Sequence, residues 1–372
     1  MIAQIIFLWK FQSIVSFIHH PSLAKSAPTQ QPFPLHTAIA HIMKPSPYSN
    51  DEYTVGWISA LRDELTVAMA MLDDEHGRPQ STPLEDRNAY HLGQIGEHKV
   101  AMACLSGGQM GTGRAAAVAV NMRRTFKNIR FALLVGIGAG VASMKDVRLG
   151  DVVVSYPQET YTGVVQYDYG KLKGDGDIER KDWFSAPPDK LLAAVDVLEA
   201  LHSRPKKPIN DMPKILDELG EEYGYPDENK APDRLYKADF THDPEFETCA
   251  SCSTEFLVKR EARKSPQMPQ VHYGIIASGS LVIKNGVERD KINQRYQNSV
   301  LCFEMEAAGL MNNFPCLVIR GISDYGDSHK NDNWRKRAIA VASAYAKELL
   351  SLIEPADVVI LPPISKVLGE GT

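Results

Sequence analysis

The sequence predicts one α/β domain built on a mixed sheet. Between residues 53 and 353, apolar runs of strand length alternate with segments that repeat their apolar side chains at helical spacing. Some strand runs, such as Phe131–Val135, are apolar at every position, which is typical of strands covered on both faces. With 372 residues and 44% apolar content, the chain is also large enough to bury a full core.

The individual elements follow from these periodicities and from the turn residues between them. Gly96 and Glu97 turn two strands into a hairpin, and Pro187 and Pro188 suit the amino end of a helix. The expected strands are 53–60, 90–95, 99–105, 131–135, 151–155, 273–280 and 314–319. The expected helices are 63–72, 115–126, 187–201 and 333–353.

Composition divides the chain into three parts. Residues 1–50 begin with an apolar run that Lys10 interrupts and continue in Pro, Ser, His and Gln, so we expect a poorly structured extension. Its apolar run is too short to span a bilayer and lacks the basic start of a signal peptide. Residues 51–354 form the predicted domain, with a Pro-rich, charged insertion at 204–270, and residues 355–372 are expected to be a mobile tail or linker.

The charge balance and the cysteines exclude several partners. A formal net charge of −5 and a pI near 6.1 provide no basic field for a nucleic acid backbone. Cys104, Cys302 and Cys316 lie in apolar contexts, which suits free thiols in a reducing compartment. We therefore expect a cytoplasmic protein with neither a nucleic acid nor a membrane partner.

Cys249 and Cys252 form a lone Cys-x-x-Cys pair, with His242 seven residues before the first thiol. This pattern is half a zinc site, because a structural zinc ion normally takes four ligands. Two free or loosely paired thiols are the alternative. The sequence leaves the choice open.

Two acidic clusters, 303–309 and 320–327, flank the apolar strand Phe314–Ile319. Asp324 follows the carboxyl end of this strand, where open α/β sheets place their ligands, and Glu306 opens a helix shortly before it. We expect both carboxylates to face one crevice. An ionised carboxylate accepts hydrogen bonds from two neighbouring hydroxyls, as on a ribose, whereas a half-buried carboxylic acid can protonate a departing purine nitrogen. The pair therefore predicts nucleoside chemistry.

Six motifs make the chain from about Tyr53 to Ile353 resemble the purine/uridine phosphorylase superfamily. They are 53–58 (YTVGWI), 136–140 (GIGAG), 148–154 (RLGDVVV), 272–279 (HYGIIASG), 303–309 (FEMEAAG) and 320–324 (RGISD). The chain is most similar to fungal members, which are often fused to ankyrin, tetratricopeptide or nucleotide-oligomerisation modules. The resemblance implies a three-layer α/β sandwich around a mixed, partly barrel-like sheet. It also implies a homo-oligomer, since the related enzymes are dimers, trimers or hexamers.

The resemblance also assigns the groups around the glycosidic bond. Glu306 matches the family's acceptor for ribose hydroxyls, and Met305 packs against the sugar. Asp324 matches the acid that protonates the purine near N7, with Ser323 beside it. Cleavage builds negative charge on the base, so this proton lowers the barrier. The alternative interpretation is that Glu306 caps a helix and Asp324 ends a strand.

The nucleophile distinguishes hydrolases from phosphorylases within this superfamily. A bound phosphate needs cations and hydrogen-bond donors around it. Phosphorylases supply an arginine at the first turn and an Arg-x-Gly-Ser/Thr unit, which would be expected at 134–137. This sequence has neither. The turn 59–64 instead resembles that of methylthioadenosine/S-adenosylhomocysteine nucleosidases, with Glu64 at the position of their water-activating glutamate. We therefore expect a purine nucleosidase in which Glu64 and Asp324 are catalytic.

Contacts to the base are expected from Val282 and Ile283, which match positions that present backbone and apolar groups to the ring in related nucleosidases. They also fit ordinary core residues. Gly136 and Gly138 let the backbone approach base and sugar, although turn formation alone also explains them. The predicted reaction on a small purine nucleoside uses no cofactor and no metal.

Two alternatives stay open. Phosphorolysis is one. Arg62 is adjacent to the site in sequence but would point elsewhere on an ideal helix start, whereas Arg114 follows the second glycine loop, where a phosphate contact stays open. Glu64 also fits a first-turn acid that favours the helix dipole. A module that senses a nucleoside or nucleotide without turnover is the other. The intact set of Glu64, Glu306 and Asp324 favours catalysis, since binding alone needs no general acid.

Overall fold

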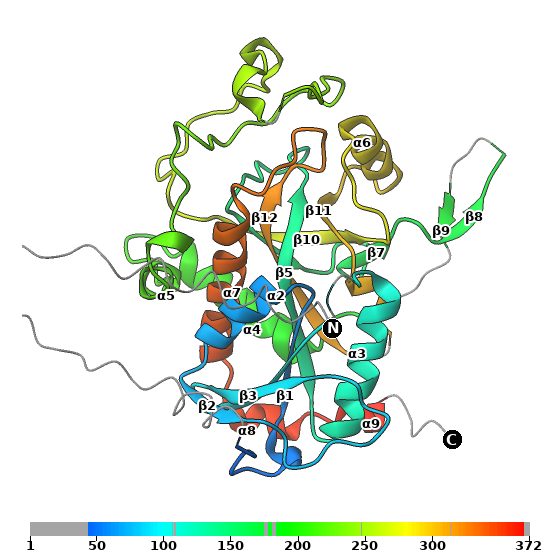
Figure 1. The fold of residues 1–372 in the computed structure, drawn as a ribbon, viewed down its shortest axis with the longest axis vertical. Coiled ribbons are helices and arrows are strands. Elements are labelled where there is room, and N and C mark those ends of the chain that lie inside the picture. Colours follow the sequence, from blue (N-terminus) through cyan, green and yellow to red (C-terminus); the bar gives the residue numbers. More distant parts are fainter. Residues whose placement is uncertain are drawn as a thin grey trace, which may run out of the picture. The chain divides into compact units, whose positions relative to one another are not determined.

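A ten-stranded mixed sheet runs through the described part of the computed structural model (Figure 1). Its strands are β1 (Val55–Ser59), β2 (Asp74–Gly77), β3 (Tyr90–Ile95), β4 (His98–Cys104), β5 (Phe131–Gly140), β6 (Val152–Ser155), β7 (Val164–Gln166), β10 (Val271–Ser278), β11 (Val300–Glu304) and β12 (Cys316–Asp324). They follow the order β11-β10-β6-β12-β5-β1-β4-β3-β2, and β7 pairs with β10. In this order β11 is the first strand and β5 the fifth, and an antiparallel pairing between these two strands closes the five into a ring. This closure confirms the predicted mixed, partly barrel-like sheet. A separate hairpin joins β8 (Gly170–Leu172) to β9 (Ile178–Arg180).

The structure describes residues 44–105, 107, 109–174, 178–180, 184–246, 248–312 and 314–367, all within the compact unit His41–Thr372. Most of the predicted extension 1–50 therefore lies outside the described residues. From Lys44 onward the chain contacts the domain, and the hydroxyl of Ser46 lies 2.7 Å from that of Tyr53. Within the described ranges, we find no helix whose length and apolar content would let it cross a membrane.

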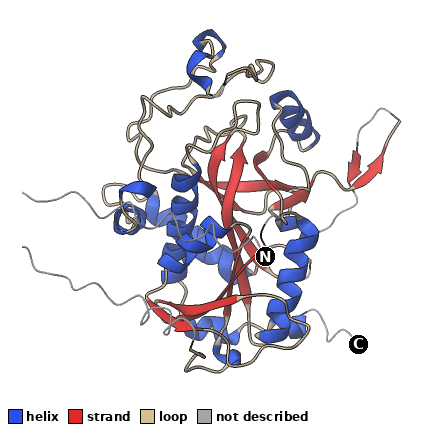
Figure 2. Ribbon diagram, in the orientation of Figure 1, coloured by secondary structure: helices blue, strands red, loops and turns tan. Residues whose placement is uncertain are grey.

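Helices cover the sheet on both sides (Figure 2). They are α2 (Arg62–Ala70), α3 (Thr112–Thr125), α4 (Asp189–His202), α5 (Met212–Glu218), α6 (Gly286–Arg295), α7 (Arg335–Ser351), α8 (Pro355–Ile360) and α9 (Ile364–Val367), with short 3-10 turns η1 (Asn50–Glu52), η2 (Glu221–Tyr223), η3 (Cys249–Ser251), η4 (Thr254–Phe256) and η5 (Ala307–Gly309). In β1, Val55 and Trp57 pack with α2 and α7 in one core, whereas Ile58 packs with α3 in a second core. Alternate side chains of one strand thus serve two helical layers, as a three-layer sandwich requires.

Strands β5 and β12 are longer than the sequence pattern indicated. The glycine run expected to leave the sheet after Val135 continues β5 to Gly140, and β12 runs on from Ile319 to Asp324. The two strands pair in parallel along this whole length. Glycine is required at position 140 because β5 and β12 pack closely there. A Cβ on Gly140 would lie 2.8 Å from the side chain of Ile322. The close packing at the sheet closure explains residues that resemble a turn in sequence.

The segment expected to be a mobile tail is folded onto the domain as far as Val367. It forms α8 and α9, in which Val358 and Ile364 are fully buried. The Ile364 amide donates to the carbonyl of Ile129 over 2.9 Å. The guanidinium of Arg130 also donates to the Leu361 carbonyl over 2.7 Å, so buried apolar side chains and hydrogen bonds together dock this stretch.

Candidate active site

A cavity of about 210 Å³ lies at the carboxyl ends of β1, β5, β11 and β12. Such an edge is where parallel strands of α/β sheets present their ligand-binding groups. All predicted site residues except Gly136 line the cavity, namely Glu64, Gly138, Val282, Ile283, Met305, Glu306, Ser323 and Asp324. Gly136 lies directly behind it, since a Cβ there would be 2.5 Å from the Glu64 carboxylate and 2.6 Å from the Arg320 guanidinium.

Glu64 is held at the cavity by the turn that precedes its own helix. Its Oε2 accepts the amides of Ala60 and Leu61 over 2.8 and 2.9 Å, and its Oε1 accepts the amide of Ile137 over 2.9 Å. Burial raises the pKa of Glu64, against the lowering effect of Arg320 and these amides. A carboxylate offers about four acceptor positions, so three bonds leave one for a water molecule or ligand. Glu64 therefore caps α2 and faces the cavity at the same time.

Arg320 is the central cation of the site and was not among the predicted site residues. It is fully buried on β12, where its Nη2 donates to the carboxylates of Glu304 and, over 3.3 Å, Glu306. A buried guanidinium needs such partners, because an unpaired charge in the interior is very costly. An arginine that follows the apolar run Cys316–Ile319 within one strand is the sequence signal that would have indicated an acidic partner.

Glu306 lies in this cluster with an unusual proton affinity. Burial raises its pKa to about 7; Arg320 lowers it, while the charges of Glu304 and Glu64 raise it further. Its Oε1 also accepts the amide of Gly111 over 3.3 Å. Glu304 has a structural role. Its carboxylate accepts hydrogen bonds from the amides of Glu306 and Ala307 and so fixes the turn that carries Glu306.

Asp324 is the last residue of β12 and is surrounded by donors. Its Oδ1 accepts the amide of Gly326 over 2.9 Å, and its Oδ2 accepts the Ser323 hydroxyl over 2.8 Å and the Lys330 ammonium over 2.6 Å. Lys330 also lines the cavity and was missed in the sequence, because it lies in a loop where a lysine carries no pattern. The carboxylate is thus fixed in orientation at the cavity wall.

Part of the cavity rim is apolar. Leu281 and Val282 follow β10 with 63% and 49% of their surface exposed, and Ile283 and Phe303 lie beside them. Exposed aliphatic side chains next to a cavity offer a flat apolar ligand a contact surface. The arrangement combines this surface with three buried carboxylates from separate segments.

This chain belongs to the phosphorylase superfamily, whose family model matches residues 54–355. The match confirms the resemblance seen in the sequence. A nucleotide-binding leucine-rich repeat (NLR)-like protein of Hyaloscypha variabilis is 44% identical over 321 residues, which are 86% of this chain and 31% of that protein. The chain thus spans less than one third of the length of this relative.

More distant relatives are nucleosidases. The 5′-methylthioadenosine/S-adenosylhomocysteine nucleosidase of Mycobacterium bovis is 26% identical over 307 residues, 81% of this chain and 96% of that protein. Among solved structures, the corresponding enzyme of Neisseria meningitidis, in complex with methylthio-immucillin-A, aligns over 80% of this chain and 98% of its own with a TM-score of 0.52 at 16% identity. Futalosine hydrolase of Helicobacter pylori covers 82% of this chain and 99% of its own, with a TM-score of 0.50 at 16% identity. These two similarities support the fold.

Proposed function

We propose that this protein is a purine nucleoside N-ribohydrolase, which splits the N-glycosidic bond with water into free base and ribose. The observation that carries the proposal is that Glu64, Glu306 and Asp324, from three separate segments, line one cavity. A structural role would explain each carboxylate separately but would not explain why all three line the same cavity. The nucleosidase relatives, at 26% identity and below, support the same reaction class.

Each acid has one task in the proposed reaction. Glu306 accepts hydrogen bonds from the ribose hydroxyls, and Met305 contacts the sugar. Asp324 protonates the purine near N7 as the glycosidic bond breaks, and Glu64 accepts a proton from the water that attacks the ribose carbon. The base leaves with a proton and the sugar gains a hydroxyl, so the atoms balance. The rim residues Val282 and Ile283 contact the base.

The pairing of the cations supports water over phosphate as the nucleophile. Among the described residues that line the cavity, the cations are Arg320, Lys330 and Arg335. Each is already paired: the first with Glu304 and Glu306, the second with Asp324, and Arg335 with Asp63 over 3.3 Å. A phosphate needs cations that are free to bind it.

The two arginines that left phosphorolysis open lie elsewhere. The side chain of Arg62 is 93% exposed and Arg114 is also exposed, and neither is among the described residues that line the cavity. Glu64 itself would repel a phosphate anion. These features favour hydrolysis.

A product assay with and without phosphate tests the proposal. Purified protein is incubated with adenosine, inosine, guanosine and 5′-methylthioadenosine, and base and sugar products are separated. We expect ribose or its 5′-thio derivative at equal rates in both buffers. Ribose 1-phosphate formed only when phosphate is present would overturn hydrolysis. Glu64→Gln should lower kcat by about 10²–10⁴-fold, whereas Glu97→Gln, at an exposed hairpin turn, should leave it unchanged.

The pKa of Glu306 predicts the pH dependence of this reaction. Below a pH of about 7 the carboxyl group is protonated, and above it the carboxylate is free to accept two ribose hydroxyls. We therefore expect kcat/KM to rise with pH up to about 7 and then to level off. Glu306→Gln should lower kcat/KM and abolish this step in the pH profile. A wild-type profile that is flat between pH 5 and pH 9 would contradict the assignment.

A sensing module is the second candidate, and the NLR-like relative favours it. The chain matches 31% of that protein's length, as expected of one module among several. Such a module would bind a purine nucleoside or nucleotide without turnover. Calorimetric binding together with no base release from any substrate in the panel would support this candidate over the hydrolase.

A further inference from the structure

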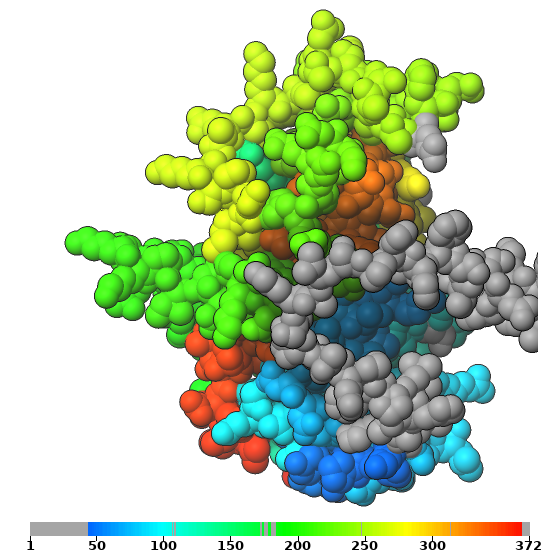
Figure 3. Space-filling model, turned by 60° about the vertical axis from the view of Figure 1, so that its left-hand side comes forward, coloured from blue at the N-terminus to red at the C-terminus, as the bar shows by residue number. Residues whose placement is uncertain are grey.

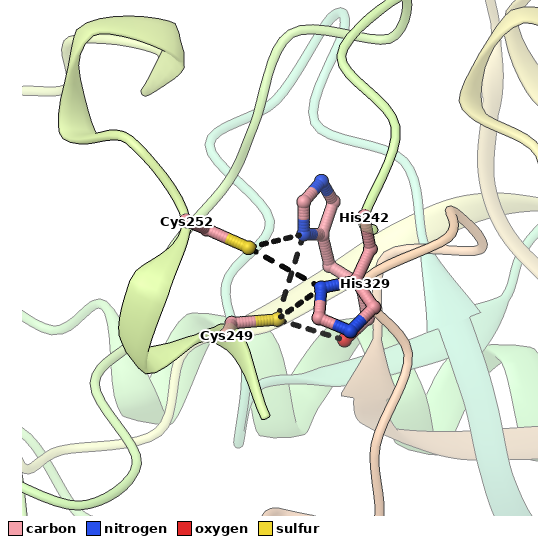
Figure 4. A group of neighbouring side chains, drawn as sticks. All are labelled: His242, Cys249, Cys252 and His329. Carbon is pink, nitrogen blue, oxygen red and sulfur yellow. Dashed lines mark hydrogen bonds between the residues drawn. The ribbon is translucent and has the colours of Figure 1, made fainter. Parts of the chain in front are cut away.

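Four metal-ligating side chains converge outside the cavity (Figure 4). His242, Cys249 and Cys252 come from the insertion, and His329 comes from the loop that follows β12. One ligand atom from each lies within 4.8 Å of all the others. The sequence pattern contained only the first three, because His329 lies 77 residues beyond Cys252 and only the fold supplies it.

The sulfur–nitrogen distances in this cluster match a tetrahedral zinc site. Bond lengths of about 2.3 Å to sulfur and 2.0–2.1 Å to nitrogen place a sulfur and a nitrogen ligand about 3.6 Å apart. His242 Nδ1 lies 3.7 and 3.2 Å from the sulfurs of Cys249 and Cys252. His329 Nδ1 lies 3.5 and 3.7 Å from the same two sulfurs. All four sulfur–nitrogen edges thus have nearly the length that one central ion requires.

The two imidazole rings are oriented as metal ligands. Nε2 of His242 lies 2.9 Å from the carbonyl of Phe246, and Nε2 of His329 lies 3.1 Å from the carbonyl of Phe240. A carbonyl only accepts, so each Nε2 carries the proton and each neutral ring presents the lone pair of Nδ1 to the centre. Fixing the outer nitrogen in this way is typical of metal-bound histidine. The stacked ring of Tyr236, with its centroid 3.9 Å from that of His329, holds the second imidazole in place.

The part of the insertion that carries three of these ligands, residues 237–268, buries little of its surface. Among the described residues of 237–268, none is fully buried, and Phe246 and Phe256 are 51% and 38% exposed. Its local structure consists of turns and short 3-10 helices. A segment that buries so little apolar surface needs a staple, and metal ions commonly supply one.

We propose that His242, Cys249, Cys252 and His329 bind a structural zinc ion that fastens the insertion to the loop following Asp324. Two thiolates and two imidazoles at tetrahedral spacing select zinc among the common cellular cations. Four protein ligands close the coordination sphere, which makes the site structural rather than catalytic.

The position of the site gives the zinc a defined task. His329 precedes Lys330, whose ammonium bonds Asp324 at the cavity wall. The same loop meets the insertion a second time, where the amide of His242 donates to the Ser328 hydroxyl over 2.8 Å. In Figure 3 the green and yellow insertion lies on the surface beside the orange segment that contains β12 and its loop. Zinc would thus tie the insertion to the residues behind the cavity.

Metal analysis of the full chain tests the proposal. The protein is purified without chelators, reduced with a phosphine, dialysed and analysed by plasma mass spectrometry. We expect about one zinc ion per chain, released when a mercurial blocks the thiols. Protein that holds no zinc after purification is titrated with Zn²⁺ against a chromophoric chelator, and failure to bind one ion would overturn the proposal. In that case the sulfurs and imidazoles are joined only by S–H···N hydrogen bonds.

Variants link the metal to these four residues. Cys252→Ser and His329→Ala should each reduce the bound zinc to well below one per chain, whereas Cys104→Ser, which removes a thiol outside the cluster, should leave it unchanged. Limited proteolysis gives a second readout. Chelation of the wild-type protein should accelerate cleavage within 237–268 and leave the sheet intact. Zinc retained in both ligand variants, or cleavage indifferent to chelation, would contradict the proposed staple.

Discussion

Asp324→Asn is expected to reduce kcat for purine nucleosides by about 10²–10⁴-fold while changing the dissociation constant by less than about tenfold. The amide keeps the shape of the carboxyl group, and its single oxygen can still accept from one of the two donors, Gly326 or Lys330, so we expect the cavity wall to remain in place. It lacks the acidic proton that the departing base needs. Single-turnover kinetics give the rate, and calorimetry with the unreacted nucleoside gives the affinity.

A leaving-group comparison separates proton donation from positioning in this variant. A 4-nitrophenyl riboside releases a stable phenolate that needs no proton, so its cleavage should suffer far less than that of adenosine. Equal losses on both substrates would mean that Asp324 acts by position. Asp290→Asn is the matched control, because it removes an exposed carboxylate on α6 outside the described cavity lining and should leave both rates unchanged.

The fold was predictable because its information is local. Strands of continuous apolar residues and helices with apolar stripes are visible in the sequence, and the observed elements agree with most of the expected ranges. Two of the errors occurred where long-range packing overrides local preference. Gly136–Gly140 looks like a turn, yet it continues β5 because β12 and β11 pack closely against it. The last two short helices were missed for the same reason, since Val358 and Ile364 find their core only in the folded domain.

The candidate site was partly predictable for a different reason. Glu306 and Asp324 flank an apolar strand, which predicted that they face one crevice, and the resemblance to nucleosidases assigned Glu64 to the same site. Lys330 and His329 stand in no motif, and their partners lie on segments that only the fold brings close. Such residues can be identified only from distances and hydrogen bonds in the structure, because their sequence neighbours give no indication of their partners.

Arg320→Met is expected to lower the free energy of unfolding by about 3–5 kcal/mol, because it leaves two buried carboxylates without their cation. Glu304 and Glu306 are 5% and 4% exposed, so water cannot replace the guanidinium. Methionine retains an unbranched apolar side chain in place of the arginine stem and removes the charged guanidinium. Urea unfolding followed by circular dichroism measures the change. Arg62→Met, at a side chain that is 93% exposed, should change the stability by less than about 0.5 kcal/mol.

The pH dependence identifies the cause of that destabilisation. The pKa of Glu306 in the folded protein is already above its ordinary value, and removal of Arg320 raises it further. A carboxyl group with a raised folded pKa costs stability as pH rises above its unfolded pKa, so the deficit of Arg320→Met should be small at pH 5 and large at pH 8. Adding Glu304→Gln and Glu306→Gln removes the unpaired charges and should recover part of the loss at pH 8. A deficit that is equal at both pH values, or no recovery in the triple variant, would show that packing rather than buried charge makes Arg320 necessary.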